Sequence, residues 1–233
     1  MRRVWAERFG VAPAAFRESG PVFVDRSDLA AAVVVRFGQT VAVAAPERAL
    51  ARLRSLGPGQ LLQVGSLLGA LEPLAPSLLG VASLAFADHG TIAPVAADAA
   101  RTASTADVEV VMSKCSVAER DESGLLDMDT RWVTLGEDGE PAGAAGYEVW
   151  GGGLAHIGVA VAAGSRGRGL GARAATAAAV HAIGLGLVPQ WRCRQDNLAS
   201  VRVGERLGFV RIGEQIAIDL APDDRDVEHA ARS

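Results

Sequence analysis

The chain of 233 residues is poor in the residue types that define several classes of protein. It has two cysteines, Cys115 and Cys193, which are too few for a disulfide framework or a cysteine-rich metal site. No apolar run reaches the roughly 18 residues of a membrane span, and the charged start MRRVWAERFG is not followed by the apolar core of a signal peptide. We therefore expect a cytoplasmic protein that contacts no membrane.

Basic charge is also limited. The net charge is −4, and Lys114 is the single lysine. This balance argues against non-specific binding of nucleic acid, so any cationic site must be local. The four histidines show no ligand spacing, and we expect no metal. Hydrophobic residues make up 49% and charged residues 21% of the chain, which is typical of a protein that folds around a core.

The first part of the chain, residues 1–95, reads as a small α/β region. Two β-branched runs around FGQT predict a hairpin at 31–45. Pro46 is suited to a first helical turn and Gly57 to the end of that helix. A second helix is expected from Gln60 to Leu74, and a strand over 81–88.

Residues 96–221 show a second pattern, in the order α-β-β-β-α-β-α-β, before a polar tail at 222–233. Its first helix is expected to begin at a Ser104–Asp107 capping box and to continue through residue 123. This order predicts an α+β or α/β fold with a mixed, mostly antiparallel twisted sheet flanked by helices, in which one β-α-β step is parallel.

The stretch GSRGRGLGARAATAAAVHA, Gly164 to Ala182, carries the clearest chemistry. A strand at 153–163 runs directly into it, and the alanine-rich run predicts a helix over 168–185. The first N–H groups of a helix lack partners within the helix and attract anions, and glycines let an anion approach the backbone. Arg166 and Arg168 add forked donors suited to phosphate oxygens. The stretch therefore predicts a pyrophosphate site.

Two familiar pyrophosphate motifs do not fit this stretch. A nucleotide-hydrolase P-loop needs Gly-Lys-Ser/Thr, and the stretch has no lysine. A dinucleotide fingerprint needs Gly-x-Gly-x-x-Gly and an acidic residue about 20 residues later, and neither is present.

The pattern that is present, Arg166-x-x-Gly169-x-Gly171, resembles the signature of the GCN5-related N-acetyltransferases (GNAT). A second segment, with Asn197, Ser200 and Gly208-Phe209, resembles the Asn-x-x-Ser/Ala…Gly-Phe segment of the same family. The resemblance covers roughly Thr102 to Leu220. It points to a bacterial subgroup with an extra N-terminal α/β region.

The resemblance implies a GNAT-like fold and acetyl-CoA as cosubstrate. In the family, the backbone of the loop holds the pyrophosphate, the asparagine meets the pantetheine arm, and an N–H of the preceding strand polarises the thioester carbonyl. The cofactor-binding residues that it implies here are Gly158, Val159, Ala160, Val161, Arg166, Gly167, Arg168, Gly169, Leu170, Gly171, Ala172, Asn197 and Ser200.

The catalytic groups are less defined. The family often has a tyrosine acid four residues before the Gly of Gly-Phe, where this chain has Gly204. Either Tyr147, the only tyrosine, serves as acid, or another group or water does, or the thiolate leaves unaided. His156 is a candidate base that needs little tuning, and Glu148, beside Trp150, could bind or deprotonate a cationic amine.

We therefore expect an acetyl-CoA-dependent N-acetyltransferase that acts on the primary amine of a small molecule such as an amino acid, a polyamine or an amino-bearing antibiotic. Two alternatives stay open: an N-terminal acetyltransferase of proteins or peptides, and a non-catalytic acyl-CoA-binding regulatory module. The N-terminal region would cover the acceptor pocket or make the contact of a homodimer.

Overall fold

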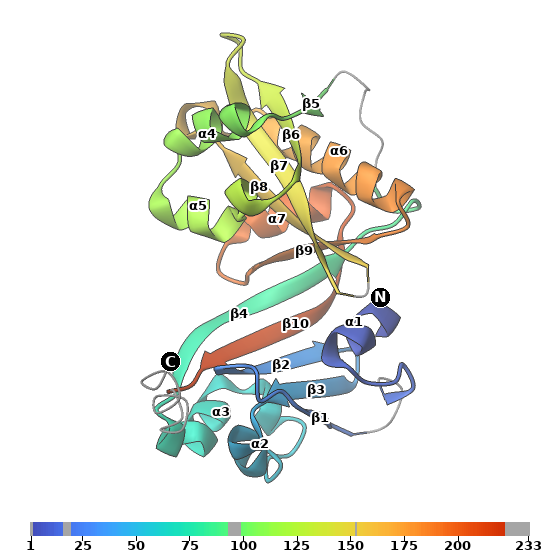
Figure 1. The fold of residues 1–233 in the computed structure, drawn as a ribbon, viewed down its shortest axis with the longest axis vertical. Helices are drawn as coiled ribbons and strands as arrows, with labels where there is room; N and C mark the ends of the chain where they lie inside the picture. The colour runs from blue at the N-terminus through green and yellow to red at the C-terminus, as the bar shows by residue number, and fades with distance from the viewer. Residues whose placement is uncertain (1, 16–19, 93–98, 152, 222–233) are drawn as a thin grey trace, which may run out of the picture. The chain divides into compact units, whose positions relative to one another are not determined.

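The computed structural model describes residues 2–15, 20–92, 99–151 and 153–221 (Figure 1). The chain forms two compact units. One consists of residues 84–211, and the other consists of residues 2–83 together with the segment that starts at Ile212. Within the described residues, no helix is both long and apolar enough to cross a membrane.

In the unit built from residues 2–83 and the segment that starts at Ile212, the strands lie in the order β1-β3-β2-β10-β4. Its strands are β1 (Val22–Asp25), β2 (Ala31–Phe37), β3 (Thr40–Ala45), β4 (Ser77–Phe86) and β10 (Val210–Asp219). Its helices are α1 (Arg2–Phe9), α2 (Glu47–Leu53) and α3 (Val64–Leu71). The expected hairpin is confirmed, because β2 and β3 pair antiparallel from Val33–Ala44 to Phe37–Thr40.

Two local predictions in this unit are wrong. Helix α2 ends at Leu53 and is capped by Arg54 rather than Gly57. Gly57 instead begins the next turn, because its carbonyl accepts from the Gln60 N–H at 2.9 Å and its own N–H donates to the Gln60 side chain at 2.9 Å. The helix expected from Gln60 to Leu74 is split, since Gln63 is extended and separates a 3₁₀ turn from α3.

The unit of residues 84–211 holds the Gly/Arg stretch. Its helices are α4 (Thr105–Ser113), α5 (Val117–Ser123), α6 (Leu170–Gly184) and α7 (Leu198–Arg206). Its strands are β5 (Arg101–Thr102), β6 (Thr130–Leu135), β7 (Pro141–Trp150), β8 (Leu154–Val161) and β9 (Val188–Arg194). Strands β5 to β8 pair antiparallel in sequence order, whereas β8 and β9 pair parallel through the crossover helix α6. The predicted mostly antiparallel sheet with one parallel step is confirmed.

The two faces of this sheet pack against different helices, as Figure 1 shows, with α4 and α5 to the left of the strands and α6 to their right. Because side chains alternate along a strand, neighbouring residues of β7 and β8 point to opposite faces. Ala145 and Ile157 belong to a cluster with the buried alanines of α6. Ala144 and Ala160 belong to a cluster with Val108, Val111 and Met112 of α4 and with residues of the segment after α5.

The single helix expected through residue 123 is in fact two helices. Ser104 and Asp107 form the predicted capping box of α4, but that helix ends at Ser113. A second capping box follows, in which Ser116 accepts from the Glu119 N–H and the Glu119 carboxylate accepts from the Ser116 N–H. This reciprocal pair satisfies the first backbone donors of α5 and starts a new helix there.

The compact units do not follow the expected division at 95 and 96. Residues from Leu84 lie with the second unit, and residues from Ile212 lie with the first. The reason is that β4 and β10 are long strands that each have residues in both units. The expected tail at 222–233, like residues 93–98 of the connector before β5, lies outside the described residues.

Candidate functional site

The site begins with the loop that joins β8 to α6. After β8, a 3₁₀ turn (Ala163–Ser165) leads to Arg166, and the backbone then takes positive φ at Gly167 (77°) and Gly169 (75°). Residues with side chains rarely adopt this conformation, so glycine is needed at both positions. A Cβ there would meet no atom within 4 Å, so the backbone angle, and not crowding, is the reason.

Gly169 is the residue that precedes the first turn of α6. In the described structure no side chain caps this end of the helix. The N–H groups of Leu170, Gly171 and Ala172 therefore lack the i−4 partners that later residues have, as in every helix start. Together with the positive end of the helix dipole, they form a donor set suited to an anion.

Gly171 holds this donor set close to the sheet. A Cβ at this position would lie 2.6 Å from Cγ2 of Val161 and 3.1 Å from Cγ2 of Val159. Only glycine therefore allows the first turn of α6 to pack directly over the last residues of β8.

Both arginines of the loop have carboxylate partners. Arg166 Nη2 lies 2.6 Å from Glu119 Oε1 of α5, and Arg168 Nη1 lies 3.1 Å from Glu137 Oε1 in the turn between β6 and β7. Hydrogen bonds from the Ser116 N–H and hydroxyl, followed by the charge of Arg166, lower the pKa of Glu119. The two guanidinium groups are half-exposed and already paired.

The second predicted segment follows β9. Asn197 caps α7, since its Oδ1 accepts from the Ser200 N–H at 3.1 Å. Its Nδ2 donates to Glu122 Oε1 of α5 at 3.2 Å. The hydroxyl of Ser200 accepts from Trp191 Nε1 at 3.1 Å. The predicted cofactor residues of α7 thus make contacts to α5 and to β9.

Strands β8 and β9 part between these two segments. Their register covers Leu154–His156 and Val188–Gln190, while β8 continues to Val161 and β9 to Arg194. The loop with Arg166 follows the end of one strand, and Asn197 follows the end of the other. The topology therefore brings the two predicted cofactor-binding segments to the same end of a diverging parallel pair.

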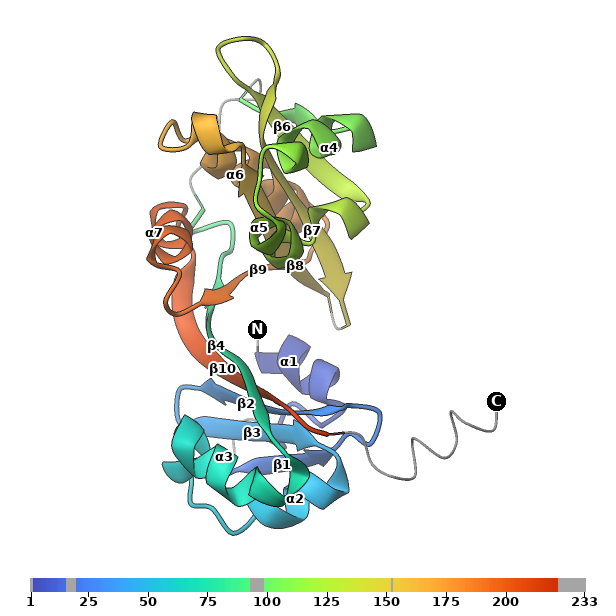
Figure 2. The same cartoon turned by 90° about the vertical axis from the view of Figure 1, so that its left-hand side faces the viewer.

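Gly158 lies in the diverging part of β8 and packs against α5. A Cβ at this position would lie 2.1 Å from the carbonyl oxygen of Ser123 and 2.7 Å from Cε of Met128. The backbone approaches closely at this glycine, and the segment that makes the approach is the end of α5, which lies beside β8 in Figure 2.

The three catalytic candidates do not come together. Tyr147 lies on the face of the sheet that packs against α6, buried among that cluster, and its hydroxyl is 3.0 Å from Nδ1 of His181. Glu148 and His156 are direct cross-strand partners and lie on the opposite face. Of the three candidates, only Glu148 and His156 lie next to each other.

Trp150 joins Glu148 and His156. Its Nε1 donates to Glu148 Oε2 at 2.8 Å, and its ring stacks on the imidazole of His156 with centroids 4.2 Å apart and planes 20° apart. The parallel register continues the row to Gln190 of β9, which pairs with His156. The arrangement gives one carboxylate, one imidazole and an aromatic face beside the point where β8 and β9 part.

Gly204 stands where the family often has a tyrosine, and the Trp191 ring of β9 fills the space beside it. A Cβ on Gly204 would lie 2.9 Å from Cδ1 and 3.1 Å from Cγ and Nε1 of the Trp191 ring. No larger side chain fits at Gly204 while this indole keeps its place. Cys193, two residues further along β9, is a buried thiol whose pKa is raised by burial.

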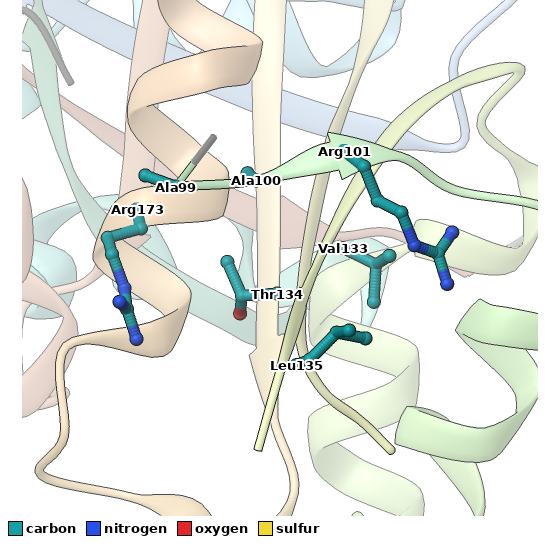
Figure 3. Close-up of a pocket in the computed structure, with 7 residues that line it drawn as sticks. All are labelled: Ala99, Ala100, Arg101, Val133, Thr134, Leu135 and Arg173. Carbon is teal, nitrogen blue, oxygen red and sulfur yellow. The ribbon is translucent and has the colours of Figure 1, made fainter. Parts of the chain in front are cut away.

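A surface pocket of about 250 Å³ lies elsewhere, between α6 and the β5–β6 edge of the sheet (Figure 3). Its lining residues are Ala99, Ala100, Arg101, Val133, Thr134, Leu135 and Arg173. None of the predicted site residues lines it. Arg101 is bound to Asp107 at 2.7 Å, which makes it part of the α4 cap.

Sequence reasoning missed two residues that contact the site, Glu119 and Glu122, and it missed the contact of Trp191 with Gly204. The Ser116-x-x-Glu119 pattern is a capping-box signal and could have located Glu119. No sequence signal connects Glu122 to Asn197 or Trp191 to Gly204, because those contacts join segments that are far apart in the chain. Across the described ranges, no group of three or more His, Cys, Asp or Glu side chains could hold a metal ion.

Comparison with known proteins shows which family this unit resembles. Residues 98–209 match the model of the acetyltransferase (GNAT) family. No protein with a curated description matches the chain. A GCN5-related N-acetyltransferase-like protein from Streptococcus suis has a similar fold, with 18% identity, a TM-score of 0.51, and 94% of this chain and 98% of that chain covered.

Two further solved structures are similar over part of the chain. A GNAT-family protein from Novosphingobium aromaticivorans is 21% identical, with a TM-score of 0.48 and 63% of this chain and 68% of that one covered. A GNAT-family acetyltransferase from Colwellia psychrerythraea is 14% identical, with a TM-score of 0.48 and 62% and 57% covered. The chain thus spans less than two thirds of the Colwellia protein.

Residues 98–209 therefore form a domain of the GNAT acetyltransferase family. The expected fold class, a mixed and mostly antiparallel sheet flanked by helices, is confirmed.

Proposed function

We propose that the protein is an acetyl-CoA-dependent N-acetyltransferase that acts on the primary amine of a small molecule. The observation that carries the proposal is the donor set at the start of α6. Uncapped N–H groups follow two glycines with positive φ, at the end of β8, inside a segment that matches the GNAT family.

The residues present fit the polar parts of acetyl-CoA, which when bound would supply the acetyl thioester. The N–H groups of Gly167 to Ala172, with Arg166 and Arg168, would hold the pyrophosphate. Asn197 and residues 158–161 of β8, which pair with β7 but lie beyond the register with β9, offer amide and backbone partners for the pantetheine arm. One N–H of that strand segment would donate to the thioester carbonyl as negative charge develops there.

On the acceptor side, Glu148 and His156 lie together on one face. The carboxylate of Glu148, held by the Trp150 indole, would bind the ammonium form of the amine. His156 would take the proton that the amine must lose before it attacks the thioester. Tyr147 lies on the other face, so we assign it no step.

Calorimetric titration with acetyl-CoA tests the proposal, with ATP and NAD as competing nucleotides. We expect selective binding that is at least tenfold weaker in Arg166→Ala. Arg52→Ala is the matched control, because it removes the same charge from an exposed position on α2, in the other compact unit, and should leave binding unchanged. Absence of binding to acetyl-CoA or any other acyl-CoA would overturn the proposal.

A second candidate is favoured by the contact between Trp191 and Gly204. Because the indole fills the place of the family's acid, a module that binds acyl-CoA without turnover is the alternative. Thiol release in a screen of amines separates the two functions. Release with any amine supports the enzyme, and binding without release across the screen supports the module.

We further propose that the protein acts in the cytoplasm. Both cysteines are free and buried, which suits a reducing compartment. The acceptor we infer carries a cationic amine. We also propose that the N-terminal unit joins two copies of the protein in a homodimer. Light scattering of the purified protein tests the homodimer.

A further inference from the structure

Helix α5 contacts both of the segments that we assign to the cofactor. Near its start, Glu119 pairs with Arg166 of the loop after β8, with 2.6 Å between Oε1 and Nη2. Near its end, Glu122 accepts from Asn197 Nδ2 at the start of α7, at 3.2 Å. These two glutamates are one helical turn apart, so a single short helix joins the ends of the two diverging strands.

The junction before α5 adds further contacts to the loop. The Ala163 N–H donates to the Lys114 carbonyl at 3.2 Å, and the Cys115 thiol lies 3.6 Å from the Val161 carbonyl oxygen. Together with the Glu119–Arg166 pair, they attach residues 114–119 to residues 161–166. The loop after β8 and the start of α5 are therefore directly connected.

The far end of α5 touches the strand beside the acceptor residues. The carbonyl of Ser123 packs against Gly158, which is two residues from His156 on the same face of β8. The position of α5 therefore affects both the cofactor loop and the strand that carries His156.

The two glutamates oppose the groups that the cofactor needs. A carboxylate on Arg166 competes with phosphate oxygens for the same donors and repels their negative charge. A carboxylate on Asn197 Nδ2 occupies the amide donor that would meet the pantetheine arm. Both pairs are solvent-exposed, so each is weak enough to be displaced by a ligand.

We propose that Glu119 and Glu122 are positioning residues that hold Arg166 and Asn197 in the free protein and release them when the cofactor binds. The proposal rests on the proposed function. Release would free α5 at both ends and alter the packing of Ser123 on Gly158.

The test compares CoA binding to the wild type with binding to Glu119→Gln, Glu122→Gln and the double variant by calorimetry. Glutamine at 119 keeps the capping box, because its amide oxygen still accepts from the Ser116 N–H. Asp121→Asn is the control, since Asp121 is an exposed residue of the same helix, carries the same charge and makes neither contact. We expect about two- to fivefold tighter binding for each single variant, a larger gain for the double variant, and no more than a small change for the control.

Tighter binding is a result that damage to the fold would not produce, because a distorted site binds more weakly. Amide hydrogen exchange adds a second measurement on the full chain. We expect CoA to speed exchange over residues 117–123 in the wild type, and to have a smaller effect there in the double variant, in which the helix is already released.

The outcomes separate this proposal from the proposed function. Wild-type binding with equal or weaker binding in the variants overturns the role of the glutamates and leaves the acetyltransferase proposal intact. Binding by the double variant but not by the wild type supports the role strongly, because the two contacts then block the site. Failure of both proteins to bind CoA overturns the role of the glutamates, and the titration with acetyl-CoA then decides the proposed function separately.

Discussion

The indole ring of Trp191 lies against the α-carbon of Gly204, where it fills the volume of any side chain at that position. The same ring donates from Nε1 to the hydroxyl of Ser200 and packs on Phe209 with centroids 5.3 Å apart. One residue of β9 thus contacts the start, the middle and the end of the α7 segment. In this chain the family's tyrosine position serves the packing of α7 on the sheet.

Replacement of Gly204 by alanine tests this packing. Alanine is the better helix former by about 1 kcal/mol, yet its Cβ would overlap the indole, and overpacking of this kind costs about 1–3 kcal/mol. We therefore expect a net loss of stability in urea unfolding. Gly184→Ala, in α6, is the matched control, because a Cβ there meets no atom within 4 Å, and it should leave stability equal or higher. A stable Gly204→Ala variant would show that Trp191 moves aside easily.

Tyr147 and His156 lie on opposite faces of the sheet, so we expect substitutions at these two positions to have different effects. His156→Ala should lower turnover by about 10²–10⁴-fold, the usual contribution of a general base, with acetyl-CoA binding unchanged. Tyr147→Phe removes the hydroxyl that contacts His181 and should cost about 1 kcal/mol of stability, with turnover unchanged. Thiol release and thermal unfolding measure both. A large loss of turnover in Tyr147→Phe would place the tyrosine in the reaction after all.

The capping box of α4 predicts a dependence of stability on pH. The guanidinium of Arg101, followed by the Ser104 N–H and hydroxyl, holds the pKa of Asp107 well below its usual range. The unfolded chain therefore binds the proton more readily, and the stabilisation is complete above the ordinary value of about 4 and falls as the pH drops below it. Asp107→Ala should cost about 1 kcal/mol at neutral pH and less at pH 3.

The control for this prediction is Glu109→Ala, which removes an exposed carboxylate from the same helix. Urea unfolding at pH 3 and pH 7 measures both variants. An Asp107→Ala deficit that stays constant between these pH values would show that the charge of Asp107 contributes nothing to the cap.

The two cysteines predict slow thiol chemistry. Burial raises the pKa of the Cys193 thiol, and burial followed by the charge of Glu119 raises that of Cys115. Since the thiolate is the reactive form, both should react with iodoacetamide far more slowly in the native protein than after unfolding. Mass spectrometry of the alkylated protein at pH 8 measures this. Rapid labelling of Cys193 in the native state would show that β9 and α7 open readily.

The order of elements in the acetyltransferase unit could be predicted because its signals are local. The Gly/Arg stretch before an alanine-rich run located the start of α6, and Ser104 with Asp107 located the start of α4. The break between α4 and α5 had the same kind of signal in Ser116 and Glu119. It was missed because the apolar and charged residues around it continue a helical pattern.

The grouping of the catalytic candidates could not be predicted, because it depends on side-chain direction. Tyr147 and Glu148 are neighbours in the sequence, and the pleat of β7 sends them to opposite faces of the sheet. The register of β8 on β7 then brings His156 to Glu148. With a shift of one residue in that register, the side chain of His156 would point to the other face of the sheet, away from Glu148.

The sequence by itself determined the class of this protein, because a strand, a Gly/Arg loop and the start of a helix are adjacent in the chain and need no partner to be recognised. The tertiary structure alone decided what the loop and its arginine touch. Glu119 reaches Arg166 and Glu122 reaches Asn197 only because α5 packs across β8. The Trp191 ring occupies the space beside Gly204 only because α7 packs on β9. Such contacts depend on how the surfaces of distant segments fit together, and the pattern along the chain carries no record of that fit.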